Sequence, residues 1–159
     1  YIVQETNYKN IFNIPVLTAN KSFILGYTNE DFGIYLENLP VIIFDDFTTD
    51  NKWVDFPFKV KSSAMKILKL SSKNFDLRYI YERMQLLNFE HTDHKRYYIS
   101  EYQYLKFDCP SFKEQQKISS VLSKADLEIA LLQDQLTQLQ TQKRGLMQKL
   151  LTGAVRVKI

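Results

Sequence analysis

Several features that would assign a catalytic activity are missing from this 159-residue sequence. Its four glycines, Gly26, Gly33, Gly145 and Gly153, are too widely spaced to form a phosphate-binding loop or a cofactor-binding GxG motif. The Asn-Pro-Pro or Asp-Pro-Pro stretch that an adenine methyltransferase needs is also missing. We therefore expect a protein that is not an enzyme and that uses no cofactor.

Cysteine and long apolar runs are scarce as well. The single cysteine, Cys109, excludes an intrachain disulfide framework and fits a reducing cytoplasm. No apolar run approaches the ~18 residues of a membrane span, and the first residues do not form a signal peptide. We expect a cytoplasmic protein whose natural chain begins before Tyr1, since the sequence starts without Met.

The sequence is rich in hydrophobic and aromatic residues, and its charged residues are unevenly distributed along the chain. The 45% hydrophobic and 14% aromatic content predicts a packed core. The net charge of +3 hides an acidic segment at 1–50, with two lysines and seven acids, and a basic remainder. Six lysines and one acid lie between Lys52 and Lys73. This skew is typical of a polyanion-binding surface, and the alternative is a solvated lysine-rich face.

Residues 1–110 predict a mainly β domain with one or two helices, in the α+β class. A helix is indicated by the spacing of Phe75, Tyr79, Ile80, Met84 and Leu87, with Asn74 or Asp76 as its N-cap. The expected strands are 22–27, 33–36, 40–44 (an apolar run typical of a strand buried on both faces), 53–60, 64–70 (or a short helix), 97–99 and 104–107.

Residues 111–153 predict one long helix, followed by a tail at 154–159. Ser111 and Glu114 form a capping box after Pro110, and Gly153 is a C-cap candidate. A seam with alternating spacings of four and three favours a coiled coil over a core helix of a bundle, and predicts a dimer. The seam positions are Ile118, Leu122, Ala125, Ile129, Leu132, Leu136, Leu139, Lys143, Leu146 and Leu150.

The candidate DNA contacts combine the lysine run, nearby hydroxyls and a second basic cluster next to Tyr97. Lysine, arginine and hydroxyl groups are common partners of phosphates and base edges. The same residues are also common in turns and exposed loops. The candidates are Thr48, Thr49, Lys52, Lys59, Lys61, Ser62, Ser63, His94, Lys95 and Arg96.

Two metal-dependent alternatives stay open at this stage. Asp45, Asp46 and the Asp50-Asn51-Lys52 tripeptide resemble the carboxylates and lysine of a small nuclease, with loose spacing. His91, His94 and Cys109 suggest a metal site, but no second ligand pair accompanies them.

From about residue 14 to the end, the chain resembles the specificity subunit of type I restriction–modification systems. The resemblance implies a non-catalytic target-recognition domain that reads one half of a split DNA site. It also implies a spacer helix that docks methylation subunits, with a restriction subunit in the same complex. The motifs that carry it are residues 40–48, 54–64, 94–100, Cys109-Pro110, 114–118 and 143–153.

The family pattern has two recognition domains and two helices, whereas this sequence has one of each. The opening segment of the recognition domain is also missing before Tyr1. We therefore expect a fragment, a truncated product or a half-subunit that pairs with a second copy. The rival from another class is a coiled-coil adaptor whose β domain does not bind DNA.

Overall fold

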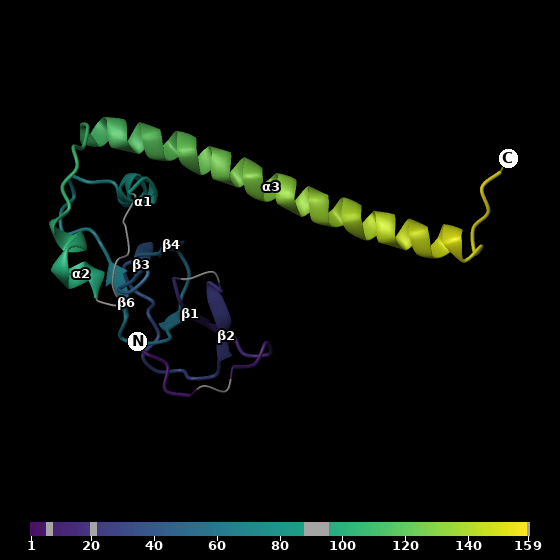
Figure 1. Ribbon diagram of the computed structural model, residues 1–159, viewed down its shortest axis with the longest axis horizontal. Helices are drawn as coiled ribbons and strands as arrows, with labels where there is room; N and C mark the ends of the chain where they lie inside the picture. Colours follow the sequence, from purple (N-terminus) through teal and green to yellow (C-terminus); the bar gives the residue numbers. More distant parts are fainter. Residues whose placement is uncertain (6–7, 20–21, 88–95, 159) are drawn as a thin grey trace. The chain divides into compact units, whose positions relative to one another are not determined.

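The computed structural model describes residues 1–5, 8–19, 22–87 and 96–158. The chain divides into two compact units, Tyr1–Gln116 and Lys117–Ile159. Figure 1 shows both sheets and the short helices in the first unit, while the second unit consists of most of a long helix and a C-terminal tail. The α+β class expected from the sequence is confirmed.

One three-stranded sheet has the order β2-β1-β5. Its strands are β1 (Ile14–Leu17), β2 (Ile24–Thr28) and β5 (Lys59–Val60). β1 is antiparallel to β2 and parallel to β5. The N-terminal residues lie along β5, because the Val60 amide donates to the Tyr1 carbonyl and the Val3 amide donates to the Val60 carbonyl.

The second sheet has the order β4-β3-β6, with antiparallel neighbours throughout. Its strands are β3 (Val41–Asp45), β4 (Asn51–Val54) and β6 (Met65–Leu68). Every residue of β3 is buried, as its continuous apolar run predicts. Val41 and Ile43 pack in one core with Leu17 and Val60 of the first sheet, whereas Ile42 and Phe44 belong to a second core.

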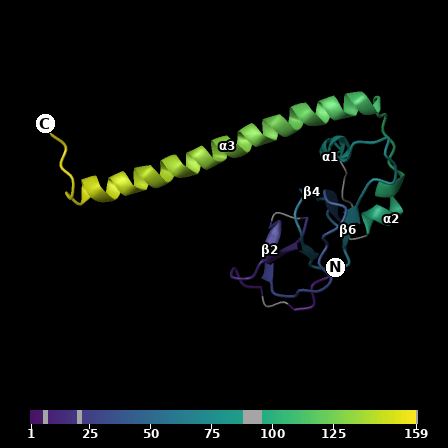
Figure 2. The same ribbon diagram turned by 180° about the vertical axis from the view of Figure 1, so that it is seen from behind.

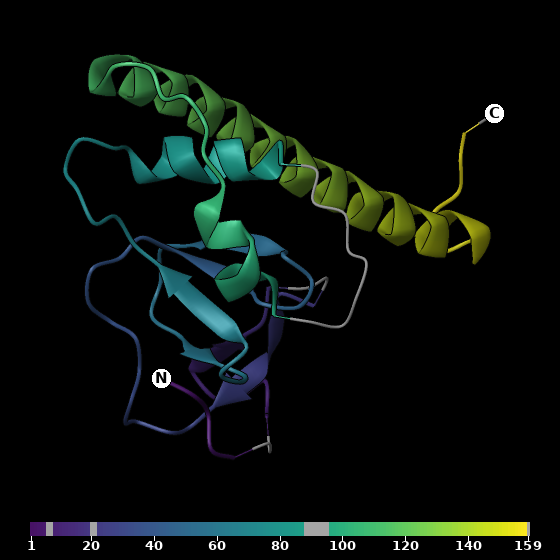
Figure 3. The ribbon, with the colours of Figure 1, turned by 60° about the vertical axis from the view of Figure 1, so that its left-hand side comes forward.

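Helical segments complete this second core. They are α1 (Leu77–Gln85), α2 (Tyr97–Ser100) and the 3-10 helix η1 (Tyr102–Tyr104). Met84 of α1 packs with Ile42 and Phe44, and Figure 3 shows α1 and α2 next to the sheet. The helix predicted from the apolar spacing is confirmed, and Asp76 is its N-cap, since Asp76 Oδ1 accepts a hydrogen bond from the Tyr79 amide at 2.9 Å.

Four strand predictions need correction. Residues 97–99 and 104–107 are not closing strands: the first lies in α2, where the Tyr97 and Tyr98 amides bond to Asp46 rather than to a strand. The second begins with the last residue of η1 and continues without strand pairing.

The remaining errors concern strand length. The segment 53–60 is divided between β4 and β5, which belong to different sheets. The segment 33–36 contributes only an isolated bridge between Tyr35 and Phe58.

The long C-terminal helix, α3 (Phe112–Leu151), has 40 residues and is continuous (Figure 2). Its predicted start is confirmed, because Ser111 Oγ accepts a hydrogen bond from the Glu114 amide at 3.4 Å. Gly153 follows it with a φ of 74°, a conformation that favours glycine and commonly ends a helix. Among the described residues, no helix combines the length and the apolar character needed to cross a membrane.

Candidate nucleic-acid interface

The turn after β3 carries the first candidate hydroxyl groups. Asp45 Oδ1 accepts hydrogen bonds from the Phe47 and Thr48 amides at 2.8 and 3.1 Å. Thr48 Oγ1 in turn accepts one from the Asp50 amide at 3.3 Å. Thr49 has a φ of 55°, which is unfavourable for a β-branched residue. Such local strain concentrates at functional sites, so this turn is a candidate contact for a ligand.

Asp46 is fully buried and connects this turn to two other segments. Its amide donates to the Ala64 carbonyl at 3.0 Å, and its carbonyl accepts from the Tyr97 amide at 2.8 Å. Asp46 Oδ1 accepts from the Tyr98 amide at 2.9 Å, and Oδ2 lies 3.4 Å from Lys66 Nζ in an ion pair. One residue thus joins the turn after β3, the turn before β6 and the start of α2.

The turn before β6 carries a lysine and two hydroxyl groups. Lys61 and Ser63 are exposed, and Lys61 Nζ lies 5.7 Å from the centre of the Tyr8 ring. Ser62 is half-buried, and its Oγ accepts a hydrogen bond from the Ala64 amide at 3.4 Å. An ammonium group next to a hydroxyl group is suited to binding a phosphate oxygen.

Arg96 precedes the first turn of α2 and is exposed. Its guanidinium carbon lies 5.9 Å from the centre of the Phe47 ring, and Phe47 is itself 42% exposed. A cation and an aromatic face are therefore adjacent at the surface, an arrangement that suits contact with a phosphate backbone and its bases.

Most of the predicted DNA contacts thus gather where β3 ends and β6 begins. We call this group of residues the turn cluster; it contains Thr48, Thr49, Lys61, Ser62, Ser63 and Arg96. Lys52 lies outside it, half-buried in β4 opposite Ile43. His94 and Lys95 lie outside the described residues.

Lys59 does not lie on this surface, and we withdraw it from the candidate DNA contacts. Its side chain is fully buried in an ion pair with Glu30. Lys59 Nζ also donates to the Phe32 carbonyl at 2.8 Å and lies 4.3 Å from the centre of the Phe32 ring. The lysine run therefore mixes a structural cation with surface cations.

The aspartates considered for a nuclease have other partners. Asp45 caps its own turn, and Asp46 is tied to the Tyr98 amide and to Lys66. Asp50 is exposed. Among the residues that the structure describes, no three His, Cys, Asp or Glu side chains form a group that could hold a metal ion.

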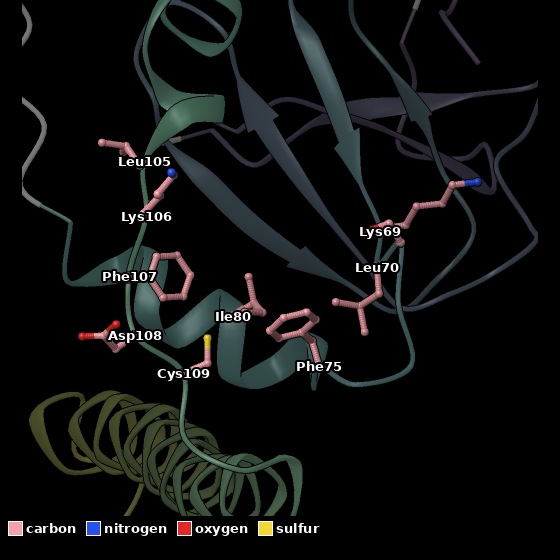
Figure 4. Close-up of a pocket in the computed structure, with 10 residues that line it drawn as sticks. Lys69, Leu70, Phe75, Ile80, Leu105, Lys106, Phe107, Asp108 and Cys109 are labelled. Carbon is pink, nitrogen blue, oxygen red and sulfur yellow. The ribbon is translucent and has the colours of Figure 1, made fainter.

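A separate groove of about 660 Å³ lies beyond the other end of β6. Figure 4 shows Leu70, Phe75, Ile80, Phe107 and Cys109 around it, with the Cys109 sulfur directed toward α1. Cys109 is a free thiol at this apolar surface. The two histidines considered with it as metal ligands lie outside the described residues.

Two positioning residues escaped the sequence analysis. Asp46 was considered only as a catalytic carboxylate, and Gln115 only as part of a motif. Gln115 is buried: its Oε1 accepts from the Asp76 amide at 3.0 Å, and its Nε2 donates to the Pro110 carbonyl at 2.8 Å. The only available signal was their place within the family-like stretches 40–48 and 114–118.

An α+β unit with polar turns at one sheet end, followed by a 40-residue helix, agrees with the organisation that the resemblance to type I specificity subunits implies. No protein-family model matches the chain. Over 143 residues, the chain is 47% identical to the type I restriction enzyme EcoR124I/EcoR124II specificity subunit of Escherichia coli. This match covers 87% of the chain and 34% of the relative, so the chain spans about a third of that protein's length. The chain is thus homologous to part of a type I restriction specificity subunit, and the resemblance is confirmed.

Proposed function

We propose that this chain is a non-catalytic DNA-recognition portion of a type I restriction–modification complex and reads one half of a bipartite target. The homology to a specificity subunit carries this proposal. The turn cluster and the neighbouring Phe47 ring support it, because hydroxyl groups, cations and an aromatic ring lie at one end of the β4-β3-β6 sheet. Phosphate contacts of this kind position a protein on DNA, and neighbouring side chains read base edges.

The second part of the proposal concerns α3. Apart from the half-buried Ile118, its seam residues are exposed in the single chain, and the leucines range from 37% at Leu122 to 61% at Leu139. A helix with such a stripe is stabilised by covering it. We propose that a second copy, or a second helix of a longer chain, covers this seam in antiparallel orientation. Near the C-terminus of α3, the exposed apolar residues Met147 and Leu151 lie beside the seam and enlarge the apolar surface. This surface supports docking of a methylation subunit there.

An adaptor that does not bind DNA is the main competing function. It shares the exposed seam but gives no role to the turn cluster. Binding of duplex DNA that weakens steeply with salt separates the two, since only the recognition function predicts it.

The direct experiment is reconstitution with a cognate methylation subunit, followed by mapping of methylated adenines on a library of random DNA. The expected result is methylation at a bipartite site, with no turnover by the chain alone in Mg²⁺, ATP and S-adenosylmethionine. Mg²⁺-dependent cleavage of DNA by the isolated chain that Asp50→Ala, at an exposed carboxylate, abolishes would establish a nuclease instead.

A further inference from the structure

Asp46 occupies an unusual position between the core and the turn cluster. It is the residue that follows β3, and its side chain is fully buried. Its backbone and carboxylate bond to Ala64, Tyr97 and Tyr98, which come from two separate segments. These contacts fix the positions of the backbone around the turn cluster.

The second carboxylate oxygen of Asp46 is directed to a different partner. Asp46 Oδ2 accepts no hydrogen bond from the residues that the structure describes, and it has Lys66 Nζ as its ion-pair partner at 3.4 Å. The Lys66 side chain is 26% exposed, so it stays partly open to solvent while its ammonium group neutralises a buried charge. A lysine held in this way gives up a strong interaction if it moves to a phosphate.

We propose that Asp46 is the positioning residue of the DNA surface: it aligns the turns that carry Thr48, Ser62 and Arg96, and it keeps Lys66 away from phosphate. This inference rests on the proposed DNA-binding function. Phosphate contacts add affinity for every sequence alike, whereas base contacts discriminate. Keeping Lys66 away from phosphate therefore lowers the share of the binding free energy that is independent of sequence and raises the share that depends on base contacts.

The test compares Asp46→Asn with the parent on two DNA probes. The asparagine keeps an oxygen acceptor for the Tyr98 amide but releases Lys66. On a 30-base-pair duplex of random sequence, the log–log salt slope should become steeper by about one, equal to a threefold to fourfold larger loss of affinity between ~50 and ~200 mM salt. Selection from a randomised duplex library should enrich a broader set of sequences than the parent selects.

The double variant Asp46→Asn/Lys66→Gln separates the charge effect from a general loosening of the fold. It should return the salt slope to the parent value, because the released cation is gone. An unchanged slope in Asp46→Asn, or a steeper slope that Lys66→Gln leaves in place, overturns the proposal.

A second comparison keeps the inference testable if Asp46→Asn does not fold. Lys66→Gln alone should leave the parent slope unchanged, whereas Lys61→Gln, at an exposed lysine, should reduce it by about one. Equal reductions would show that Lys66 contacts phosphate and overturn the proposal. Failure of the proposed function itself looks different, because the parent would then show no salt-dependent duplex binding.

Discussion

The ammonium group of Lys59 is held by the Glu30 carboxylate inside the first unit, with side chains that are 0% and 4% exposed. Glu30 Oε1 also accepts hydrogen bonds from the Gln4 and Glu5 amides at 2.8 and 2.7 Å. The pair therefore connects β5 to the N-terminal segment. Burial works to raise the pKa of Glu30, but the hydrogen bonds from Lys59 and from the Glu5 and Gln4 amides outweigh it and lower the pKa.

Lys59→Met is expected to destabilise the fold by about 3–5 kcal/mol near neutral pH, because Glu30 is left as an unpaired buried charge. In the parent, a lowered carboxyl pKa contributes stability above the unfolded value of about 4.3, and this is lost as pH falls through the folded pKa. The variant loses the Lys59 contacts that lower the pKa of Glu30, so this pKa should rise and the loss of stability should shrink as pH falls. Urea unfolding between about pH 2 and 7 measures both trends, because the parent loses this stability only below the unfolded pKa.

The matched control for this pair is Lys59→Met/Glu30→Gln, which removes both charges and keeps an acceptor for the Gln4 and Glu5 amides. It should be clearly more stable than the single variant at neutral pH. Equal stability of the two would contradict a coupled ion pair.

Gln115→Ala removes the buried amide that bonds to the Asp76 amide and the Pro110 carbonyl. We expect a loss of about 1–3 kcal/mol, because buried backbone groups lose their partners. Gln116→Ala, at the exposed neighbouring position, should change stability by less than about 0.5 kcal/mol. Chemical denaturation measures both free energies of unfolding. Similar losses of stability in the two variants would contradict the structural role of Gln115.

Lys61→Ala and Arg96→Ala should each weaken binding to all duplex sequences alike and reduce the salt slope by about one. Lys106→Ala is the control, since this exposed lysine lines the groove beyond the other end of β6. Fluorescence anisotropy across a salt series provides the slopes. Parent-like binding by both variants would place the DNA surface elsewhere.

Pairing of α3 can be tested through Glu128 and Lys149, which each precede a seam residue. If Leu136 lies against Leu139 of an antiparallel second copy, Glu128 faces Lys149 of that copy. Each single charge reversal should then weaken the dimer, by about 0.2–1 kcal/mol for each ion pair, and the double reversal should restore it. Sedimentation equilibrium measures the dissociation constants.

Parallel pairing of the two helices predicts a different result for the same variants. Glu128 would then face Gln133, so the double reversal would give no recovery. Leu136→Glu is a positive control, because a charge within the seam should separate the helices in either orientation.

Inserting one heptad between residues 125 and 145 lengthens the helix by about 10 Å. If two recognition units lie at opposite ends of an antiparallel pair, the preferred spacer should grow by about three base pairs. The half-site sequences should stay unchanged. Methylation mapping on a library of random spacers gives the answer, and an unchanged spacer in an active complex would show that α3 does not set the distance.

The elements with a strong local signal were predictable from the sequence. β3 has an uninterrupted apolar run, α1 has helical spacing and an N-cap at Asp76, and α3 has a capping box and a heptad repeat. In each of these elements, local sequence and tertiary packing favour the same structure.

The errors arose where a distant residue decides the local structure. Tyr97 and Tyr98 have strand-like composition, but Asp46 accepts their amide hydrogen bonds from more than 50 positions earlier and caps a helical turn. The sequence around Lys59 does not distinguish it from the exposed lysines nearby, and only its tertiary contact with Glu30 accounts for its burial. β1, next to the recognisable β2, also went unpredicted, since four residues provide little periodicity.

The burial of β3 on both faces has an evolutionary consequence. All of its side chains are committed to packing, yet the exposed positions Phe47, Thr48 and Ser63 contribute to neither core. Substitutions at these positions therefore change the side chains at the surface of the turns and leave the packing of both hydrophobic cores unchanged. Under the proposed function, a lineage can acquire new DNA preferences by drift at a few turn positions, whereas changes within β3 are selected against as folding defects.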